Sequence, residues 1–363
     1  MGSETSQLDP ALLARVIAPP LATAALPGVG GALRSVPEDF EVRELPAYGA
    51  DDREGAHLLL TMRKRGLTTD EAVAALTRAL ELGRGEIGVA GLKDKHAITE
   101  QWITVPWSAR DKLAAFDHPE ITLGEARPHG NKLRRGHLRG NHFTIVLRDL
   151  TVPLAEAHAR AQAKLAAIAE AGLENLFGAQ RFGHDGQNAA RGLALLRDPA
   201  AARRRRTADI VLSAGQSAIF NLLVLTRRER GLSRTVLAGD ILKKTETGGL
   251  FECAEPEVDQ ARLDAGELAI TGPIFGSKTR APSPGTAAAA LEAAALEALE
   301  LDPSALLRLG RKLPGTRRVT HVRPAGVELA TVEDERGAGL KISFALPAGS
   351  YATQLLRELC GPT

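Results

Sequence analysis

The first half of the chain alternates between strand-like and helix-like spacing of its apolar residues. Residues 40–43 alternate apolar with polar positions, and residues 57–62 form a second short apolar run, so a strand is predicted at each. Thr68-x-x-Glu71 has the sequence of a capping box, and apolar residues follow it at helical spacing. Residues 102–105 and 143–147 predict two further strands.

The second half begins with an Ala-rich amphipathic helix predicted for residues 152–171, and the pattern changes after it. A hairpin-type turn is predicted at residues 246–249 and an Ala/Leu-rich helix at 286–300. Strand-like alternation returns at residues 340–346, and a short helix is predicted for 350–359.

The length of 363 residues favours two domains, because a single hydrophobic core usually stops growing at this size. We predict an α+β fold with a mixed, mostly antiparallel sheet flanked by helices, built from residues 31–171 and 311–363. Residues 172–310 are expected to form an inserted α+β domain. Residues 1–30 are Ala/Pro/Leu-rich and end in a glycine-rich stretch, so they are expected to form an N-terminal extension.

The composition is that of an ordinary folded protein, with 44% hydrophobic and 25% charged residues. Lys and Arg number 46 and Asp and Glu 44, which excludes a uniformly basic nucleic-acid coat but allows a local basic surface. Cys253 and Cys360 cannot build a disulfide framework, which favours a reducing, cytoplasmic compartment. The chain has no run of 18 uninterrupted apolar residues, and Glu4, Asp9 and Arg15 interrupt its start, so we expect neither a membrane span nor a secretory signal.

Nucleotide and metal sites find little support in the residues. Gly272–Thr279 resembles a phosphate-binding loop, but Ser277 separates the glycine from the lysine that must follow it. The nine histidines contain no His-Glu-x-x-His or similar ligand spacing. We therefore expect no metal and no nucleotide cofactor.

Gly91–Trp102 is the stretch richest in candidate chemistry. It combines alternating charges with Thr99, Gln101 and an aromatic residue, and it lies between two predicted strands, where catalytic groups are often placed. A solvated turn with alternating charges is the alternative interpretation of the same residues.

Basic residues gather in two other places. The segment from residue 127 to 139 contains no acid, and Arg203–Arg206 forms a second run. Such runs contact nucleic-acid phosphates or simply form a solvated surface. The basic residues of the first segment are Arg127, Lys132, Arg134, Arg135 and Arg139, accompanied by His129 and His137.

Gly91–Trp102 resembles the signature of the TruD family of pseudouridine synthases, Gly-x-Lys-Asp-x-x-Ala-x-Thr-x-Gln-Trp. Other stretches resemble further family blocks in the same order, from about residue 31 to the end of the chain. Two departures lie in the predicted inserted domain, where Leu176 stands in place of a tyrosine and Gly215 in place of a bulkier residue. The four strongest further blocks are residues 37–44, 139–143, 175–183 and 346–353, and the weaker ones are 213–221 and 271–273.

This resemblance implies a cofactor-free isomerisation of a uridine in tRNA, at uridine 13 in the family, to pseudouridine. Asp94 matches the family's nucleophile. A carboxylate, with a reference pKa of about 3.9, is ionised at neutral pH and can attack without a partner base. Attack on the ribose, attack on the base and removal of a proton from the sugar all remain open. The resemblance also implies that the uridine is flipped out of its stack into the pocket.

An ionised nucleophile in a dry pocket needs a cationic neighbour. Arg34 occupies the position at which the family usually has a basic residue before the Pro-Glu-Asp-Phe block, so we expect it to be the partner of Asp94, with Lys93 as the second choice. A phosphate-contacting or solvated arginine is the alternative for Arg34.

The resemblance implies substrate contacts from Phe40 and Tyr351 as stacking or wall residues and from Asn141 as a hydrogen-bond partner of the uracil or ribose. Phe143 is a less favoured fourth candidate. Both phenylalanines alternate with apolar residues, so a core position is the alternative for each. The RNA backbone is expected to contact Lys132, Arg134, Arg135 and Arg139.

Two alternatives from the sequence compete with this function. One is a tRNA-binding or RNA-chaperone protein without catalysis, and the other is a pseudouridine synthase that acts on another RNA. Pseudouridine formation in tRNA distinguishes the predicted function from both alternatives.

Overall fold

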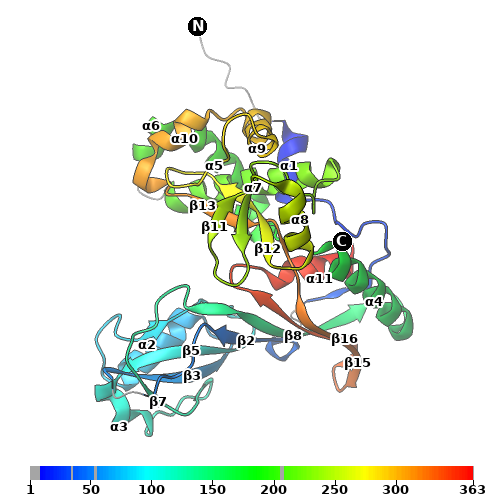
Figure 1. Cartoon of the computed structure of the whole chain (residues 1–363). Helices are drawn as coiled ribbons and strands as arrows, with labels where there is room; N and C mark the ends of the chain where they lie inside the picture. Colours follow the sequence, from blue (N-terminus) through cyan, green and yellow to red (C-terminus); the bar gives the residue numbers. More distant parts are fainter. Residues whose placement is uncertain (1–8, 34–35, 53–54, 205–207, 363) are drawn as a thin grey trace. The chain divides into compact units, whose positions relative to one another are not determined.

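The structure is a computed structural model that describes residues 9–33, 36–52, 55–204 and 208–362 (Figure 1). The chain divides into two compact units. The helical unit contains Met1–Ala24 and Ala171–Val322, and the large-sheet unit contains Ala25–Glu170 and Arg323–Thr363. Each unit is described below by itself.

The large-sheet unit is built on a ten-stranded sheet in the order β15-β16-β8-β2-β5-β3-β6, with β1, β4 and β7 paired to β8, β5 and β3. Among the described strands only β2 and β5 pair in parallel, so the predicted mixed, mostly antiparallel sheet is confirmed. The strands are β1 Gly30–Ala32, β2 Phe40–Pro46, β3 His57–Arg65, β4 Gly88–Val89, β5 Ile98–Pro106, β6 Ile121–Leu123, β7 Arg127–His129, β8 Leu138–Leu150, β15 Ala325–Asp334 and β16 Gly337–Pro347. The helices are η1 Pro37–Asp39, α2 Thr69–Ala79, η2 Trp107–Ala109, α3 Arg110–Leu113, α4 Leu154–Ala171 and α11 Ala352–Cys360.

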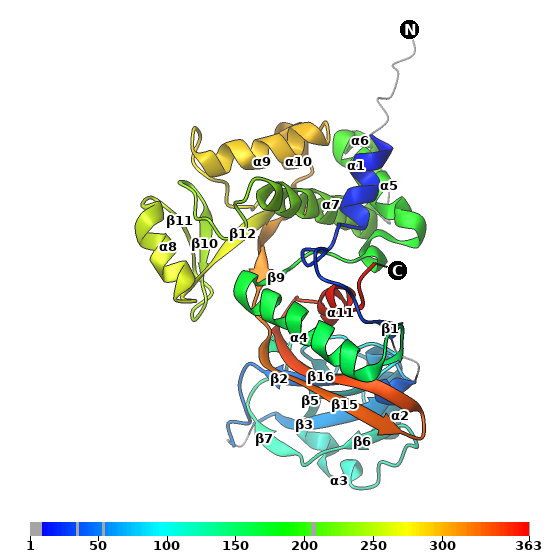
Figure 2. The ribbon, with the colours of Figure 1, turned by 90° about the vertical axis from the view of Figure 1, so that its right-hand side faces the viewer.

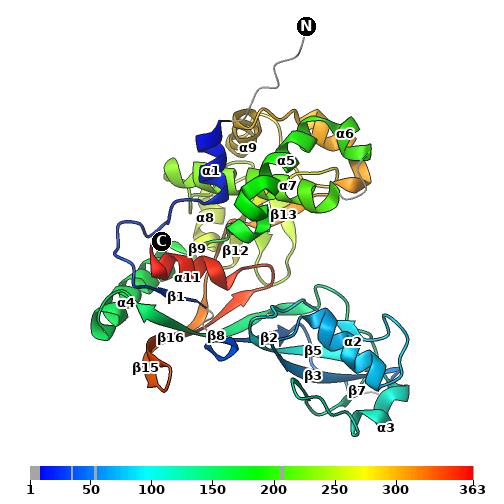
Figure 3. The ribbon, with the colours of Figure 1, turned by 180° about the vertical axis from the view of Figure 1, so that it is seen from behind.

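Helix α2 covers one face of this sheet, as Figure 3 shows. It begins with the predicted capping box: the Thr68 hydroxyl accepts a hydrogen bond from the Glu71 N–H at 3.1 Å, and the Glu71 carboxylate accepts one from the Thr68 N–H at 2.7 Å. Ala72 and Leu76 are fully buried against apolar residues of β3 and β5. Burial of this apolar face, rather than helix propensity, stabilises so short a helix.

Strand register places the inward-facing residues of three strands on the same face as α2. Val42 of β2 lies opposite Phe143 of β8, and Phe143 in turn lies opposite Phe344 of β16. Glu44 and Asn141 form the next inward pair of β2 and β8. Two-residue periodicity therefore aligns an apolar layer and a polar pair along one face.

The helical unit has α7 at the centre of its core. The segment Asp209–Glu229 is long and apolar enough to cross a membrane, but 72% of its most apolar window is buried inside the unit. The helix is therefore a core helix. Figure 2 shows α8 beside the small sheet of β10, β11 and β12. The elements are α1 Pro10–Ile17, β9 Leu173–Glu174, η3 Ala179–Phe182, η4 His184–Gly186, α5 Gln187–Arg197, α6 Pro199–Arg204, α7 Ala208–Glu229, β10 Ile241–Lys244, β11 Leu250–Glu252, α8 Pro256–Asp264, β12 Leu268–Ile274, α9 Ala287–Ala298, α10 Pro303–Arg308, η5 Gly310–Lys312, β13 Thr316–Val319 and β14 His321–Val322.

The N-terminal residues are divided between the two units instead of forming one extension. Val16 of α1 is fully buried in the core of the helical unit, and its carbonyl accepts a hydrogen bond from the Asn221 side chain at 3.0 Å. Residues 30–32 form β1 at the edge of β8 in the large-sheet unit. Val16 and Val29 of the predicted extension are thus core residues.

The last boundary between the units lies at Val322/Arg323, whereas the sequence analysis placed it at residues 310/311. Long-range pairing explains the difference. Residues 316–319 form β13, which pairs with β12, and residues 321–322 form β14, which pairs with β9. Neither pairing is visible in the local pattern of residues 311–322.

Candidate active site

The segment 91–95 is held in place by buried polar side chains beneath it. The Thr69 hydroxyl accepts a hydrogen bond from the Lys93 N–H at 2.9 Å and donates one to Gln101 Oε1 at 2.9 Å. The Gln101 side-chain amide donates to the Gly91 carbonyl at 3.2 Å. Thr69 starts α2 and Gln101 lies in β5, so a helix and a strand together fix the conformation of the segment.

Asp94 is exposed on this segment, and its main chain is anchored from below. Its carbonyl accepts a hydrogen bond from Lys64 Nζ at 2.9 Å. Lys64 is only 1% exposed and also donates to the Leu67 carbonyl at 2.5 Å. Burial lowers the pKa of Lys64 to about 8, although the charge of Asp94 acts in the opposite direction.

Lys93 has a buried ammonium that joins Glu44 to Asn141. Its Nζ donates to Glu44 Oε2 at 2.5 Å and to Asn141 Oδ1 at 2.8 Å. Because an ammonium only donates hydrogen bonds, the side-chain oxygen of Asn141 must face Lys93, and the NH₂ group of Asn141 must point elsewhere. Lys93 is the second-choice cation for Asp94, and in the structure its ammonium contacts Glu44 and Asn141.

Phe40 and Phe143 lie in the apolar layer of the sheet. They are 2% and 7% exposed, and their rings meet edge to face with centroids 6.4 Å apart. Phe143 also stacks on Phe344 with centroids 5.3 Å apart. Both rings are therefore core residues of the sheet, on the same face as Asn141.

Tyr351 is 40% exposed and stands directly before α11. The strand β16 that leads to it pairs Leu346 with Asn141, and the Ala348 N–H donates to the Arg139 carbonyl at 2.9 Å. These contacts place the turn before Tyr351 along the start of β8, next to Asn141.

The basic segment before β8 is attached beside the strand that leads to Asp94. The Leu133 N–H donates to the Thr104 hydroxyl at 3.0 Å, and the Gly136 N–H donates to the Ala90 carbonyl at 2.9 Å. Three arginines of this segment are exposed and have no ion pair within the part of the chain that the structure describes. They are Arg134, Arg135 and Arg139.

The other cations named by the sequence analysis have different surroundings. Lys132 is half-buried and donates to the Gly85 carbonyl, while Arg203 donates to the Arg308 carbonyl. Arg34 lies outside the described residues, as do the last two arginines of the 203–206 run.

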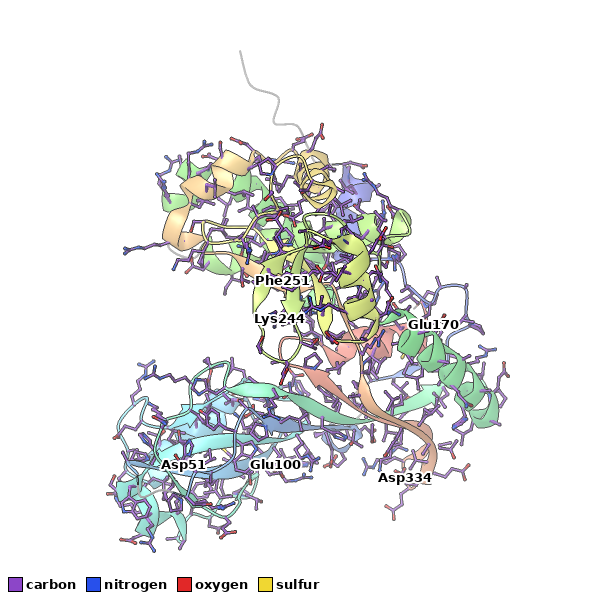
Figure 4. All side chains as sticks on the ribbon, viewed as in Figure 1. Asp51, Glu100, Glu170, Lys244, Phe251 and Asp334 are labelled. Atoms are coloured by element: carbon purple, nitrogen blue, oxygen red, sulfur yellow. The ribbon has the colours of Figure 1, made fainter. Side chains whose placement is uncertain are left out.

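Residues 38–39, within one of the family blocks, anchor the start of β2. Asp39 is 1% exposed and pairs with the guanidinium of buried Arg148 at 2.9 Å. Arg148 also pairs with Asp334 at 2.8 Å. Asp334 is the last residue of β15 and is labelled in Figure 4. Hydrogen bonds from Arg65 lower the pKa of Glu38, and those to Asp334 and Asp39 raise the pKa of Arg148. This block therefore holds the strand that carries Phe40 and Glu44.

We expect the substitution Arg148→Met to destabilise the protein by about 3–5 kcal/mol, because it leaves the buried Asp39 carboxylate with only the partly exposed Arg336, 3.5 Å away, as a cation. Urea denaturation measures the loss. Lys112→Met is the matched control, since it breaks an exposed pair with Glu81 and should cost less than about 1 kcal/mol. Equal losses in the free energy of unfolding of the two variants would show that the buried pair of Arg148 with Asp39 stabilises the protein no more than an exposed pair.

Sequence analysis assigned no role to Glu44, Lys64 or Thr69. Glu44 and Lys64 share a recognisable signal, because each is a charged residue at an inward position of an alternating strand. Glu44 follows the inward residues Phe40 and Val42, and Lys64 follows Leu60 and Met62. Such positions are costly for a charge unless it is paired or hydrogen-bonded. The partners themselves are not encoded in the local pattern.

Known proteins resemble this chain over most of its length. The model of the family "tRNA pseudouridine synthase D (TruD)" matches residues 20–204 and 202–359. A tRNA pseudouridine synthase D from Anaeromyxobacter sp. (strain Fw109-5) is 44% identical over 346 residues, which cover 94% of this chain and 95% of the relative. Another from Thermus thermophilus is 40% identical over 343 residues, covering 94% of this chain and 91% of that relative.

The fold has a solved counterpart. The crystal structure of a TruD protein from Methanosarcina mazei superposes with a TM-score of 0.76 at 23% identity, over 97% of this chain and 98% of that one. Fold and relatives together define the class of this protein, a tRNA pseudouridine synthase and hence an isomerase. Within that class the chain belongs to the TruD family. The resemblance, the α+β fold and the enzyme class expected from the sequence are confirmed.

Proposed function

We propose that the protein converts the uridine at position 13 of tRNA to pseudouridine, with Asp94 as the nucleophile. The observation that carries this proposal is the presentation of Asp94: its carboxylate is exposed, while the segment around it is fixed by buried side chains of a helix and two strands. Such pre-organisation is what nucleophilic catalysis requires, because the attacking group loses little freedom on binding.

The reaction is an isomerisation and consumes no co-reactant. The bond from ribose C1′ to uracil N1 breaks, the uracil rotates, a bond from C1′ to C5 forms, and the proton on C5 is lost and taken up at N1. An ionised Asp94 serves each of the three open routes: attack on C1′, attack on the uracil ring, or removal of a proton from the sugar. Our proposal draws on no metal and no cofactor in any of them.

The substrate uridine is bound after it has left its stack, at a cost of a few kcal/mol. The oriented NH₂ group of Asn141 is suited to donate to a uracil carbonyl or a ribose oxygen. The exposed ring of Tyr351 supplies a wall on which the base can stack. Phe40 and Phe143 support this face from the apolar layer, and we propose that a base touches only what little of them is exposed.

The tRNA backbone is proposed to contact the three exposed arginines beside the Asp94 segment, with Lys132 in a lesser role. Phosphate contacts use Arg and Lys without reading sequence, and arginines already paired to carboxylates are less suited to them. We further propose that the large-sheet unit is the catalytic domain, that the helical unit is the TRUD domain, and that the enzyme works in the cytoplasm.

Replacing Arg134 and Arg135 together by Ala should weaken tRNA binding and reduce the slope of log K against log salt by about 2, one for each lost phosphate contact. Titration of tRNA binding at several KCl concentrations measures this slope. Arg63→Ala is the control, because Arg63 is already paired with Glu41 and should leave the slope unchanged. An unchanged slope in the double variant would remove this segment from the RNA interface.

Mapping of pseudouridine in tRNA incubated with the protein tests the proposed function. Formation at position 13 is the expected result. Formation only at another position, or only in another class of RNA, would contradict the proposed substrate while leaving the enzyme class intact.

A further inference from the structure

Lys64 is a buried cation directly beneath the segment that carries Asp94. It occupies an inward position of β3, and only 1% of its surface is exposed. An apolar side chain would fill such a position at no electrostatic cost, whereas a buried ammonium must be compensated by hydrogen bonds or opposite charge. The residue therefore requires an explanation beyond packing.

Both described hydrogen bonds of Lys64 end on main-chain carbonyls. One belongs to Leu67, in the turn before α2, and the other to Asp94 itself. Strand β3 lies inside the sheet between β5 and β6, and α2 packs on it. Lys64 thus ties the main chain of the proposed nucleophile to a central strand and to a helix start.

Three charged groups act on the Lys64 ammonium besides its burial. Asp94 and Glu71 favour its charged form, and Lys93 opposes it. The pKa of about 8 leaves Lys64 largely protonated at neutral pH. The hydrogen bond to the Asp94 carbonyl is therefore donated by a charged group, which makes it stronger than a neutral one.

We propose that Lys64 is a positioning residue for the isomerisation, which fixes the main chain of Asp94 through the hydrogen bond that its buried ammonium donates to the Asp94 carbonyl. This inference rests on the proposed role of Asp94. Arg34, the cation that the sequence predicted for Asp94, lies outside the described residues. Lys64 is a cation beneath the same segment that the structure does describe.

Three substitutions test this role. Lys64→Met removes both the charge and the hydrogen bonds, Lys64→Gln removes the charge but keeps an N–H donor, and Lys64→Arg keeps both the charge and donors. The readout is the single-turnover rate of pseudouridine formation in tRNA, together with the Kd for tRNA and the urea midpoint.

Lys64→Met should lower the maximal rate about 10- to 100-fold, the loss typical of a hydrogen bond to a charged group, while the Kd for tRNA changes less than about twofold. Lys64→Gln should lose less of the maximal rate than Lys64→Met, because it keeps a donor, and Lys64→Arg should lose the least, because it keeps both the donors and the charge.

Lys164→Met is the matched control. Lys164 in α4 is likewise fully buried, and burial likewise lowers its pKa, but the carboxylate that acts on it is Glu358. Its loss should affect the urea midpoint and leave the single-turnover rate within about twofold of wild type. If the Met variant does not fold, the Gln and Arg variants carry the test.

The proposal is overturned if a folded Lys64→Met variant keeps its rate within about twofold of wild type or, where that variant does not fold, if a folded Lys64→Gln variant does so. An Asp94→Asn variant as active as wild type would instead refute the proposed nucleophile. The two failures are therefore distinguishable.

Discussion

Asp94→Asn should abolish pseudouridine formation in transcribed tRNA, with a loss of at least about 10³-fold in rate, because the amide is of equal size but cannot act as an anionic nucleophile or base. Binding should persist, since Asp94 adds negative charge and therefore does not contribute phosphate contacts. Release of tritium from C5-labelled uridine in tRNA measures the reaction, and the salt dependence of the Kd measures binding.

Asp117→Asn is the matched control for this substitution, because Asp117 is an exposed loop residue of the same unit and should tolerate the change. Equal activity of wild type and Asp94→Asn would show that another group attacks. If wild type itself modifies no tRNA, the protein binds RNA without this chemistry or modifies another RNA.

Lys93→Met is the second substitution for which we expect a large effect, on stability as well as on rate. The ammonium is the cation paired with Glu44, whose side chain is fully buried, so its loss should cost about 3–5 kcal/mol in the free energy of unfolding. Activity should fall as well, because the oxygen of Asn141 loses the donor that orients its amide.

The double variant Lys93→Met/Glu44→Gln separates these two effects. Neutralising Glu44 removes the unpaired buried charge, so part of the stability should return, with a coupling energy of about 0.5–3 kcal/mol between the sites. Activity should not return, because Asn141 remains without its partner. Urea denaturation and single-turnover assays measure the two quantities, and full recovery of the rate in the double variant would show that Lys93 acts only through stability.

The sequence predicted those elements that depend on neighbouring residues, such as helix caps and strands with alternating apolar and polar residues. Thr68 and Glu71 form the capping box that their spacing indicated, and the alternation at residues 40–43 corresponds to β2. Helix α2 ends at Ala79, four residues before the glycine at position 83. A left-handed residue, Glu81 with φ of 54°, comes before that glycine, so the chain turns without it.

What the sequence could not predict depends on contacts between distant residues. The burial of Val16 against the helical core and the pairing of β13 with β12 come from tertiary structure, which local periodicity does not contain. The same applies to the site. Family resemblance identified Asp94, Lys93 and Asn141 as candidates, but the contacts of Lys93 with Glu44 and Asn141, and of Lys64 beneath Asp94, depend on strand register.

The pairing of β8 with β16 has a consequence for biosynthesis. Gly140–Leu147 of β8 pairs with Leu340–Pro347 of β16, so the first strand is translated long before its neighbour leaves the ribosome. Throughout that interval the edge of β8 offers unpaired main-chain groups, on which nascent chains can associate. A stalled or truncated polypeptide that lacks the last strands is therefore a natural client for chaperones, even though every residue around Asp94 has already been made.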